Sequence, residues 1–87
     1  MEDLEKEIKN LAGWKKVENK LNKNFKFKDF IEAFSFVTKI ALISEKMNHH
    51  PDITISYNSV HIDLTTHDIN DISKNDIILA GKIEELI

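Results

Sequence analysis

The chain has 87 residues, a length that suits one domain with a modest core. Its 12 basic residues are all lysine and its net charge is −3, which argues against nucleic-acid binding. Because it contains no cysteine, disulfides, thiolate nucleophiles and Cys-ligated zinc are excluded. The charged N-terminal stretch MEDLEKEIKN matches neither a signal peptide nor a membrane span, so we expect a cytoplasmic protein.

The first third of the chain predicts a short helix and a hairpin. Apolar residues at helical spacing indicate a helix over residues 3–12, with Gly13 as its C-cap. Residues 14–17 and 21–27 show the composition and alternation of two strands. Asn19-Lys20 is the predicted turn between these strands.

A long helix is predicted from Phe30 to Met47. Asp29 can cap it, and Glu32 three residues later completes a pattern typical of a capping box. Apolar residues occupy much more than one stripe of this helix, so it needs cover on two sides. The sheet of the same chain supplies one side, and we expect a second subunit to supply the other.

The last third predicts another hairpin and a final helix. Pro51 ends the long helix, residues 53–57 and 60–64 alternate as strands, and Asn58-Ser59 forms the turn. Ser73 and Asp76 give a second capping-box pattern before the last helix. The order αββαββα predicts one α+β domain over residues 1–87, a four-stranded antiparallel sheet with the helices packed on one face.

Three of the four histidines are predicted to gather at one end of this sheet. With Asn58-Ser59 as the turn, a regular hairpin carries His67 back beside His50, since directly opposed residues have Cβ atoms about 5 Å apart. Because Pro51 and the strand ends can loosen this register, we expect proximity and not a specific contact. His49 precedes His50 in the stretch NHHPD. His61 lies on the polar phase of its strand, so we expect it to be solvated and outside this cluster.

Three imidazoles can serve as metal ligands or as acid–base catalysts, or they can simply belong to a solvated loop. Zinc is poorly matched, because adjacent histidines seldom direct both rings at one metal and no H-E-x-x-H helix is present. Acid–base catalysis is better matched, because imidazoles exchange protons near neutral pH. Glu45, one helical turn before His49, is either a surface carboxylate or a group that orients an imidazole. Asp76 is interpreted first as a helix cap.

These motifs together resemble one known family. EKMNHHPD, then YNSVHIDLTTH and S-x-x-D before the last helix, is similar to the pterin-4a-carbinolamine dehydratases, also called dimerisation cofactors of a homeodomain factor in animals. GWKKVE and FKFKDFIEAFSFVTKIALISEK extend the resemblance over nearly the whole chain. It implies the αββαββα fold, homodimers or homotetramers, and dehydration of 4a-hydroxytetrahydropterin to quinonoid dihydropterin in tetrahydrobiopterin recycling. It implies no cofactor and no metal, while the charge and composition described above imply no direct nucleic-acid partner and no membrane partner.

The resemblance also assigns roles to residues. It implies that His49, His50 and His67 are catalytic, with acid and base roles left open. The family's pattern also matches three supporting groups: Glu45 beside the site, Pro51 as a rigid turn, and Asp76 as the acidic cap of the last helix. The chain departs from the family's usual pattern at two places: Ile53, shortly after H-H-P, and the stretch 68–71, which contains no glycine. These departures put the range of substrates in doubt. The alternatives are a non-catalytic dimerisation or transcriptional cofactor, and a plain metal-binding domain.

Overall fold

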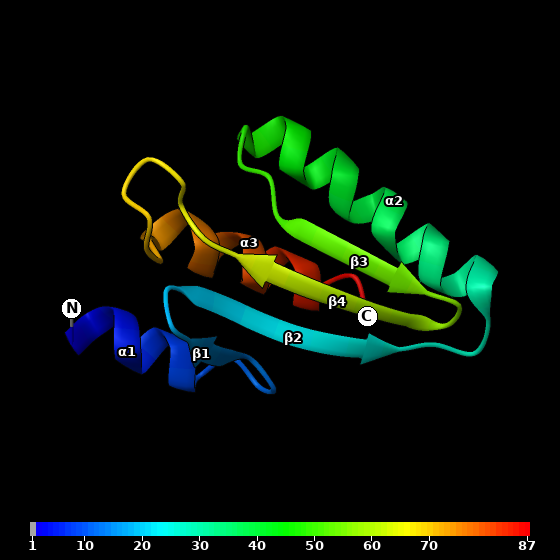
Figure 1. The fold of residues 1–87 in the computed structure, drawn as a ribbon, viewed down its shortest axis with the longest axis horizontal. Helices are drawn as coiled ribbons and strands as arrows, with labels where there is room; N and C mark the ends of the chain where they lie inside the picture. Colours follow the sequence, from blue (N-terminus) through cyan, green and yellow to red (C-terminus); the bar gives the residue numbers. More distant parts are fainter. Residues whose placement is uncertain (1) are drawn as a thin grey trace.

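The computed structural model describes residues 2–87, with side chains described from Leu4 onward. The elements in chain order are α1 (Glu2–Lys9), β1 (Lys15–Val17), β2 (Lys20–Lys26), α2 (Phe30–Met47), β3 (Asp52–Ser56), β4 (Ser59–Leu64) and α3 (Lys74–Glu84) (Figure 1). The predicted αββαββα order is confirmed. The first helix is shorter than predicted, because it ends at Lys9 and a turn follows. Gly13, with φ of 84°, lies in that turn and is not the C-cap.

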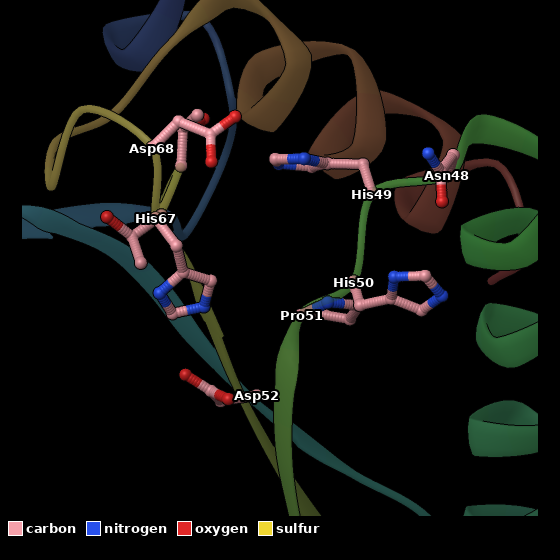
Figure 2. Close-up of a pocket in the computed structure, with 9 residues that line it drawn as sticks. Asn48, His49, His50, Pro51, Asp52, His67 and Asp68 are labelled. Carbon is pink, nitrogen blue, oxygen red and sulfur yellow. The ribbon is translucent and has the colours of Figure 1, made fainter.

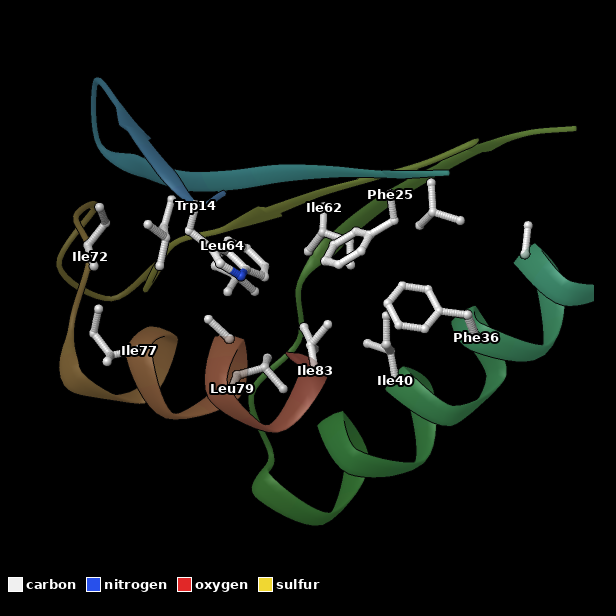
Figure 3. Packing of buried hydrophobic residues seen from close by; sticks show 14 residues of the cluster. Trp14, Phe25, Phe36, Ile40, Ile62, Leu64, Ile72, Ile77, Leu79 and Ile83 are labelled. Carbon is white, nitrogen blue, oxygen red and sulfur yellow. The ribbon is translucent and has the colours of Figure 1, made fainter. Parts of the chain in front are cut away.

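The four strands form one antiparallel sheet in the order β1-β2-β4-β3, which places β1 and β3 at its two edges. This confirms the predicted α+β class. Figure 3 shows α2 and α3 on the same side of the sheet. Their apolar side chains cover the inward face of the strands, while the other face carries polar residues.

Alternation along the central strands builds the core. The inward residues of β2 and β4 pack against α2 and α3 (Figure 3). The largest fully buried apolar side chains of this core are Leu21, Ile40, Val60, Ile62, Leu64, Leu79 and Ile83. Trp14 is buried within this cluster, and its indole N–H donates to the Glu84 carboxylate at 2.8 Å. A buried indole thus keeps its one donor satisfied.

The long helix spans Phe30–Met47 as predicted, but Asn48 and not Pro51 terminates it. The Asp29 carboxylate accepts from the Glu32 backbone N–H at 2.9 Å, and the Glu32 carboxylate accepts from the Lys28 N–H at 3.1 Å. The helix stops at Asn48, which adopts the left-handed conformation with φ of 53°. Asparagine tolerates this conformation better than most residues, so Asn48 ends the helix and Pro51 does not.

Both hairpin turns lie one residue earlier in the chain than predicted. Val17 pairs with Lys20, so the first turn is 18–19; Ser56 pairs with Ser59, so the second is 57–58. The second difference changes the pairing of the whole hairpin, so the predicted register, in which His50 and His67 are cross-strand partners, is wrong. The last β3–β4 pair is Asp52 with Asp63, so both histidines lie beyond the regular hairpin.

Candidate active site

A pocket of about 290 Å³ opens where the end of α2, the start of β3 and the loop after β4 meet. Its lining consists of Asn48, His49, His50, Pro51, Asp52, Thr65, Thr66, His67 and Asp68 (Figure 2). This volume is at the lower end of the range for small-molecule sites, roughly 300–1,000 Å³. The pocket brings together the three predicted histidines and Pro51, despite the different register. Glu45 and Asp76 are not in the lining; each contacts one of its histidines.

The end of α2 sets the directions of the first two histidines. Asn48 turns the chain out of the helix, and the His49 backbone N–H still bonds to the Ser44 carbonyl at 3.0 Å. Pro51 favours an extended backbone at the preceding residue, His50. Figure 2 shows the outcome: the His50 ring points toward α2 and away from His67, while the His49 ring points toward α3 and Asp68.

His49 is held by a buried carboxylate. Its Nε2 lies 2.5 Å from Oδ1 of Asp76, whose side chain is fully buried on the first turn of α3. The other oxygen of Asp76, Oδ2, accepts from the Ser73 backbone N–H and from the Thr66 hydroxyl, both at 2.8 Å. Asp76 is therefore both the expected helix cap and the orienting partner of His49. Buried carboxylates with several such bonds are strongly held.

His50 has a carboxylate partner of a different kind. Its Nε2 lies 2.5 Å from Oε2 of Glu45, one and a half turns earlier on α2. The side chains are 55% and 77% exposed, so water and salt screen their attraction. Glu45 thus orients the His50 ring from the protein surface.

His67 comes from the loop after β4. Backbone hydrogen bonds pair Thr66 with Asp71 and close a four-residue turn over residues 67–70. Asn70 allows this turn with φ of 52°. His67 is exposed, and within residues 2–87 its ring has no hydrogen-bonding partner. Its imidazole is the least constrained of the three.

His61 lies apart from the pocket, as predicted. It stands on the polar face of the sheet, half-buried rather than freely solvated. Its Nδ1 is 2.7 Å from Oδ1 of Asn24, and its Nε2 is 3.2 Å from Oδ2 of Asp63. Both ring nitrogens are therefore engaged within the sheet.

The sequence reasoning missed Thr66 and the two pocket carboxylates, Asp52 and Asp68. Asp52 and Asp68 each stand next to a residue of the predicted site, so simple adjacency was a usable signal. Thr66 also adjoins His67, but nothing in the sequence links its hydroxyl to Asp76.

Residues 2–87 contain no group of three or more His, Asp or Glu side chains arranged to hold a metal ion. Over the same residues, no helix has the length and apolar character needed to cross a bilayer.

Comparisons with known proteins show which family the chain resembles over nearly its whole length. Residues 1–86 match the family described as pterin 4 alpha carbinolamine dehydratase. A protein of Picosynechococcus sp., provisionally named pterin-4-alpha-carbinolamine dehydratase, is 44% identical over 97% of this chain and 91% of its own. A similarly named protein of Prochlorococcus marinus (strain MIT 9515) is 48% identical over 98% of this chain and 88% of its own length.

Solved structures show the same fold. A transcriptional coactivator/pterin dehydratase from Brucella Melitensis superposes with a TM-score of 0.92 at 37% identity, covering 97% of this chain and 92% of that one. A pterin dehydratase-like protein, identified as a RuBisCO assembly factor in the alpha-carboxysome, gives a TM-score of 0.73 at 22% identity over 86% and 89%. The second likeness concerns the fold alone.

Proposed function

Because the chain belongs to the pterin 4 alpha carbinolamine dehydratase family, we propose that it is a hydro-lyase that dehydrates 4a-hydroxytetrahydropterin to quinonoid dihydropterin. The observation that carries the proposal is the pocket of about 290 Å³ lined by His49, His50 and His67. The names of the relatives support the substrate class. The reaction would belong to tetrahydrobiopterin recycling in the cytoplasm.

The elimination needs two proton transfers. The bond between C4a and its hydroxyl breaks, and an acid supplies the proton that lets the hydroxyl leave as water. A base removes the proton from N5, and the electron pair of that N–H bond forms the C4a=N5 double bond. Imidazoles perform both tasks near neutral pH, and a positioned proton donor or acceptor typically contributes about 10²–10⁴-fold.

The three histidines differ in how firmly neighbouring residues hold their rings. Asp76 holds His49 from within the protein, Glu45 orients His50 from the surface, and His67 stands on a separate loop. A flat substrate in the pocket would therefore meet imidazoles from two elements, one before β3 and one after β4. In this proposal Pro51 keeps the backbone of His50 extended, and the protein needs no cofactor or metal.

We extend the proposal to assembly, since α2 exposes several large apolar side chains. Phe30, Ile31, Phe34 and Leu42 are between 46% and 75% exposed. An apolar patch of this kind is typical of an interaction site. We infer a homodimer or homotetramer formed through α2. This surface would also serve the alternative function, a non-catalytic dimerisation or transcriptional cofactor.

The decisive experiment is to generate the carbinolamine freshly and follow the decay of its absorbance with and without the purified protein. We expect catalytic acceleration that persists after exhaustive chelation. Decay at the uncatalysed rate would favour the cofactor alternative, and activity that chelation removes and zinc restores would favour metal catalysis. His61→Ala protein, with its substitution outside the pocket, is the matched positive control.

A further inference from the structure

We propose that Thr66 is a positioning residue: its hydroxyl fixes the orientation of Asp76 and, through Asp76, the protonated nitrogen of His49. The proposal deepens the function proposed above, and its effect on turnover rests on that function. Its structural part stands on the hydrogen bonds of the free protein.

The direction of each hydrogen bond around Asp76 follows from the chemistry of its partners. A carboxylate only accepts, so Oδ2 receives the Thr66 O–H and the Ser73 backbone N–H. The single hydroxyl proton of Thr66 is then committed to Asp76. The bond of 2.5 Å between the two hydroxyls must therefore run from Ser73 as donor to Thr66 as acceptor.

The same reasoning determines the state of His49. Its Nε2 lies 2.5 Å from Oδ1, and that oxygen can only accept. Nε2 therefore carries a proton in both the neutral and the charged imidazole, which leaves Nδ1 as the nitrogen free to exchange a proton with substrate. Hydrogen bonds therefore connect Ser73, Thr66, Asp76 and His49 in that order. The Thr66 hydroxyl and the His49 imidazole donate to the buried carboxylate of Asp76 from its two sides.

Thr66 also occupies the position that joins the two parts of the site. Its backbone N–H donates to the Asp71 carbonyl at 2.8 Å, and this pairing closes the loop that begins with His67. Its side chain reaches the carboxylate that holds His49. Thr66 thereby links His49, which precedes β3, to His67, which follows β4.

Removing the hydroxyl should loosen this arrangement without removing any histidine. In Thr66→Val, Oδ2 would keep only the Ser73 N–H, so the carboxylate can rotate and its bond to His49 weakens. We expect faster solvent exchange of the His49 Nε2 proton and a detectable Nδ1–H tautomer. We also expect turnover to fall about 10–100-fold, the range found when outer partners of metal-bound histidines are removed. The KM should change by less than about twofold, because valine has nearly the shape of threonine and the other residues that line the pocket are unchanged.

The test combines ¹⁵N NMR of labelled histidines with steady-state kinetics. Thr66→Ser keeps the hydroxyl and should restore both the Nε2–H tautomer and most of the turnover. Thr65→Val makes the same change one residue earlier, where the hydroxyl donates to the Asn19 carbonyl at 2.8 Å. It should lower stability and leave the His49 tautomer unchanged. If Thr66→Val does not fold, Thr66→Ala takes its place.

A His49 spectrum in Thr66→Val identical to that of the parent would overturn the proposal, as would a Thr66→Ser protein as impaired as Thr66→Val. The NMR result is independent of catalysis. If the parent protein does not dehydrate the carbinolamine, the proposed function fails while the tautomer measurement still decides the role of Thr66.

Discussion

His49 Nε2 and Asp76 Oδ1 lie 2.5 Å apart, although 27 positions separate these residues in the sequence. The pair joins the end of α2 to the first turn of α3 and has only 12% of the imidazole and none of the carboxylate exposed. A buried carboxylate that selects one imidazole tautomer is a known device for keeping a ring nitrogen available to substrate.

Asp76→Asn should invert the tautomer of His49. Thr66 and Ser73 both donate toward one side of residue 76, so the amide oxygen will face them and the NH₂ group will face His49. Nε2 must then accept, and the proton moves to Nδ1. We expect turnover to fall on the order of 10²–10⁴-fold with the fold intact, checked by ¹⁵N NMR, kinetics and circular dichroism.

Glu45→Gln is the matched control for that variant. It makes the equivalent change in the carboxylate partner of His50, but this pair is exposed to solvent. Exposed ion pairs contribute about 0–1 kcal/mol, so turnover should fall less than about fivefold. Equal losses in the two variants would contradict a special role for the buried pair.

Removing the histidines one at a time tests the site directly. His49→Ala, His50→Ala and His67→Ala should each lower turnover by about 10²–10⁴-fold, because each removes a candidate proton donor or acceptor. The double variant His49→Ala/His67→Ala should lose less than the product of the single losses, since groups that act together are not additive.

His61→Ala supplies the control for this series. His61 bonds to Asn24 and Asp63 on the sheet face outside the pocket, so its loss should leave turnover within about twofold of the parent. The site assignment fails if the three pocket variants keep parent-like turnover, or if His61→Ala is the most damaged.

Ser44→Ala should stabilise the protein. Ser44 is 1% exposed on α2, and among the described residues its hydroxyl has no hydrogen-bonding partner. Alanine removes that unsatisfied group and has the higher helix propensity, so we expect a gain of about 1 kcal/mol and a Tm higher by roughly 4–8 °C. Ser35→Ala, at an exposed position of the same helix, should gain about half as much. A Tm for Ser44→Ala below that of the parent would show that the hydroxyl has a partner in solution.

The sequence was sufficient for the fold because the apolar pattern decides which face of each element is buried. The turn of the second hairpin was misplaced because local rules favour asparagine, and not tyrosine, where a positive φ is needed. Tyr57 nevertheless adopts φ of 51°, since Asn58 is held by both its backbone and its side chain to Phe27. Moving the turn by one residue shifts every cross-strand partner by two, which keeps each side chain on its predicted face.

The candidate site was predictable only in part, because some of its contacts depend on how distant elements pack together. Motif spacing indicated His49, His50 and His67, and the ends of the elements place them around one pocket. The contacts of Asp76 depend on how α3 packs beside the end of α2. No periodicity links residues on two such elements, so its bond to His49 emerged only from the tertiary structure.

The exposed surface of α2 predicts the state of assembly. Ile31, Phe34 and Leu42 are 75%, 53% and 69% exposed, and α2 contacts the edge strand β3, which has a neighbour in the sheet on one side only (Figure 1). We expect sedimentation to show a dimer or tetramer at micromolar concentration. Phe34→Lys should shift the protein toward monomer, because a lysine ammonium is costly to bury in an apolar interface. Val17→Lys makes the same kind of change at a 51% exposed position on β1, the opposite edge of the sheet, and should leave the assembly unchanged. A parent protein that sediments as a stable monomer at that concentration would contradict an interface on α2, and dissociation by Val17→Lys alone would move the interface to the β1 edge.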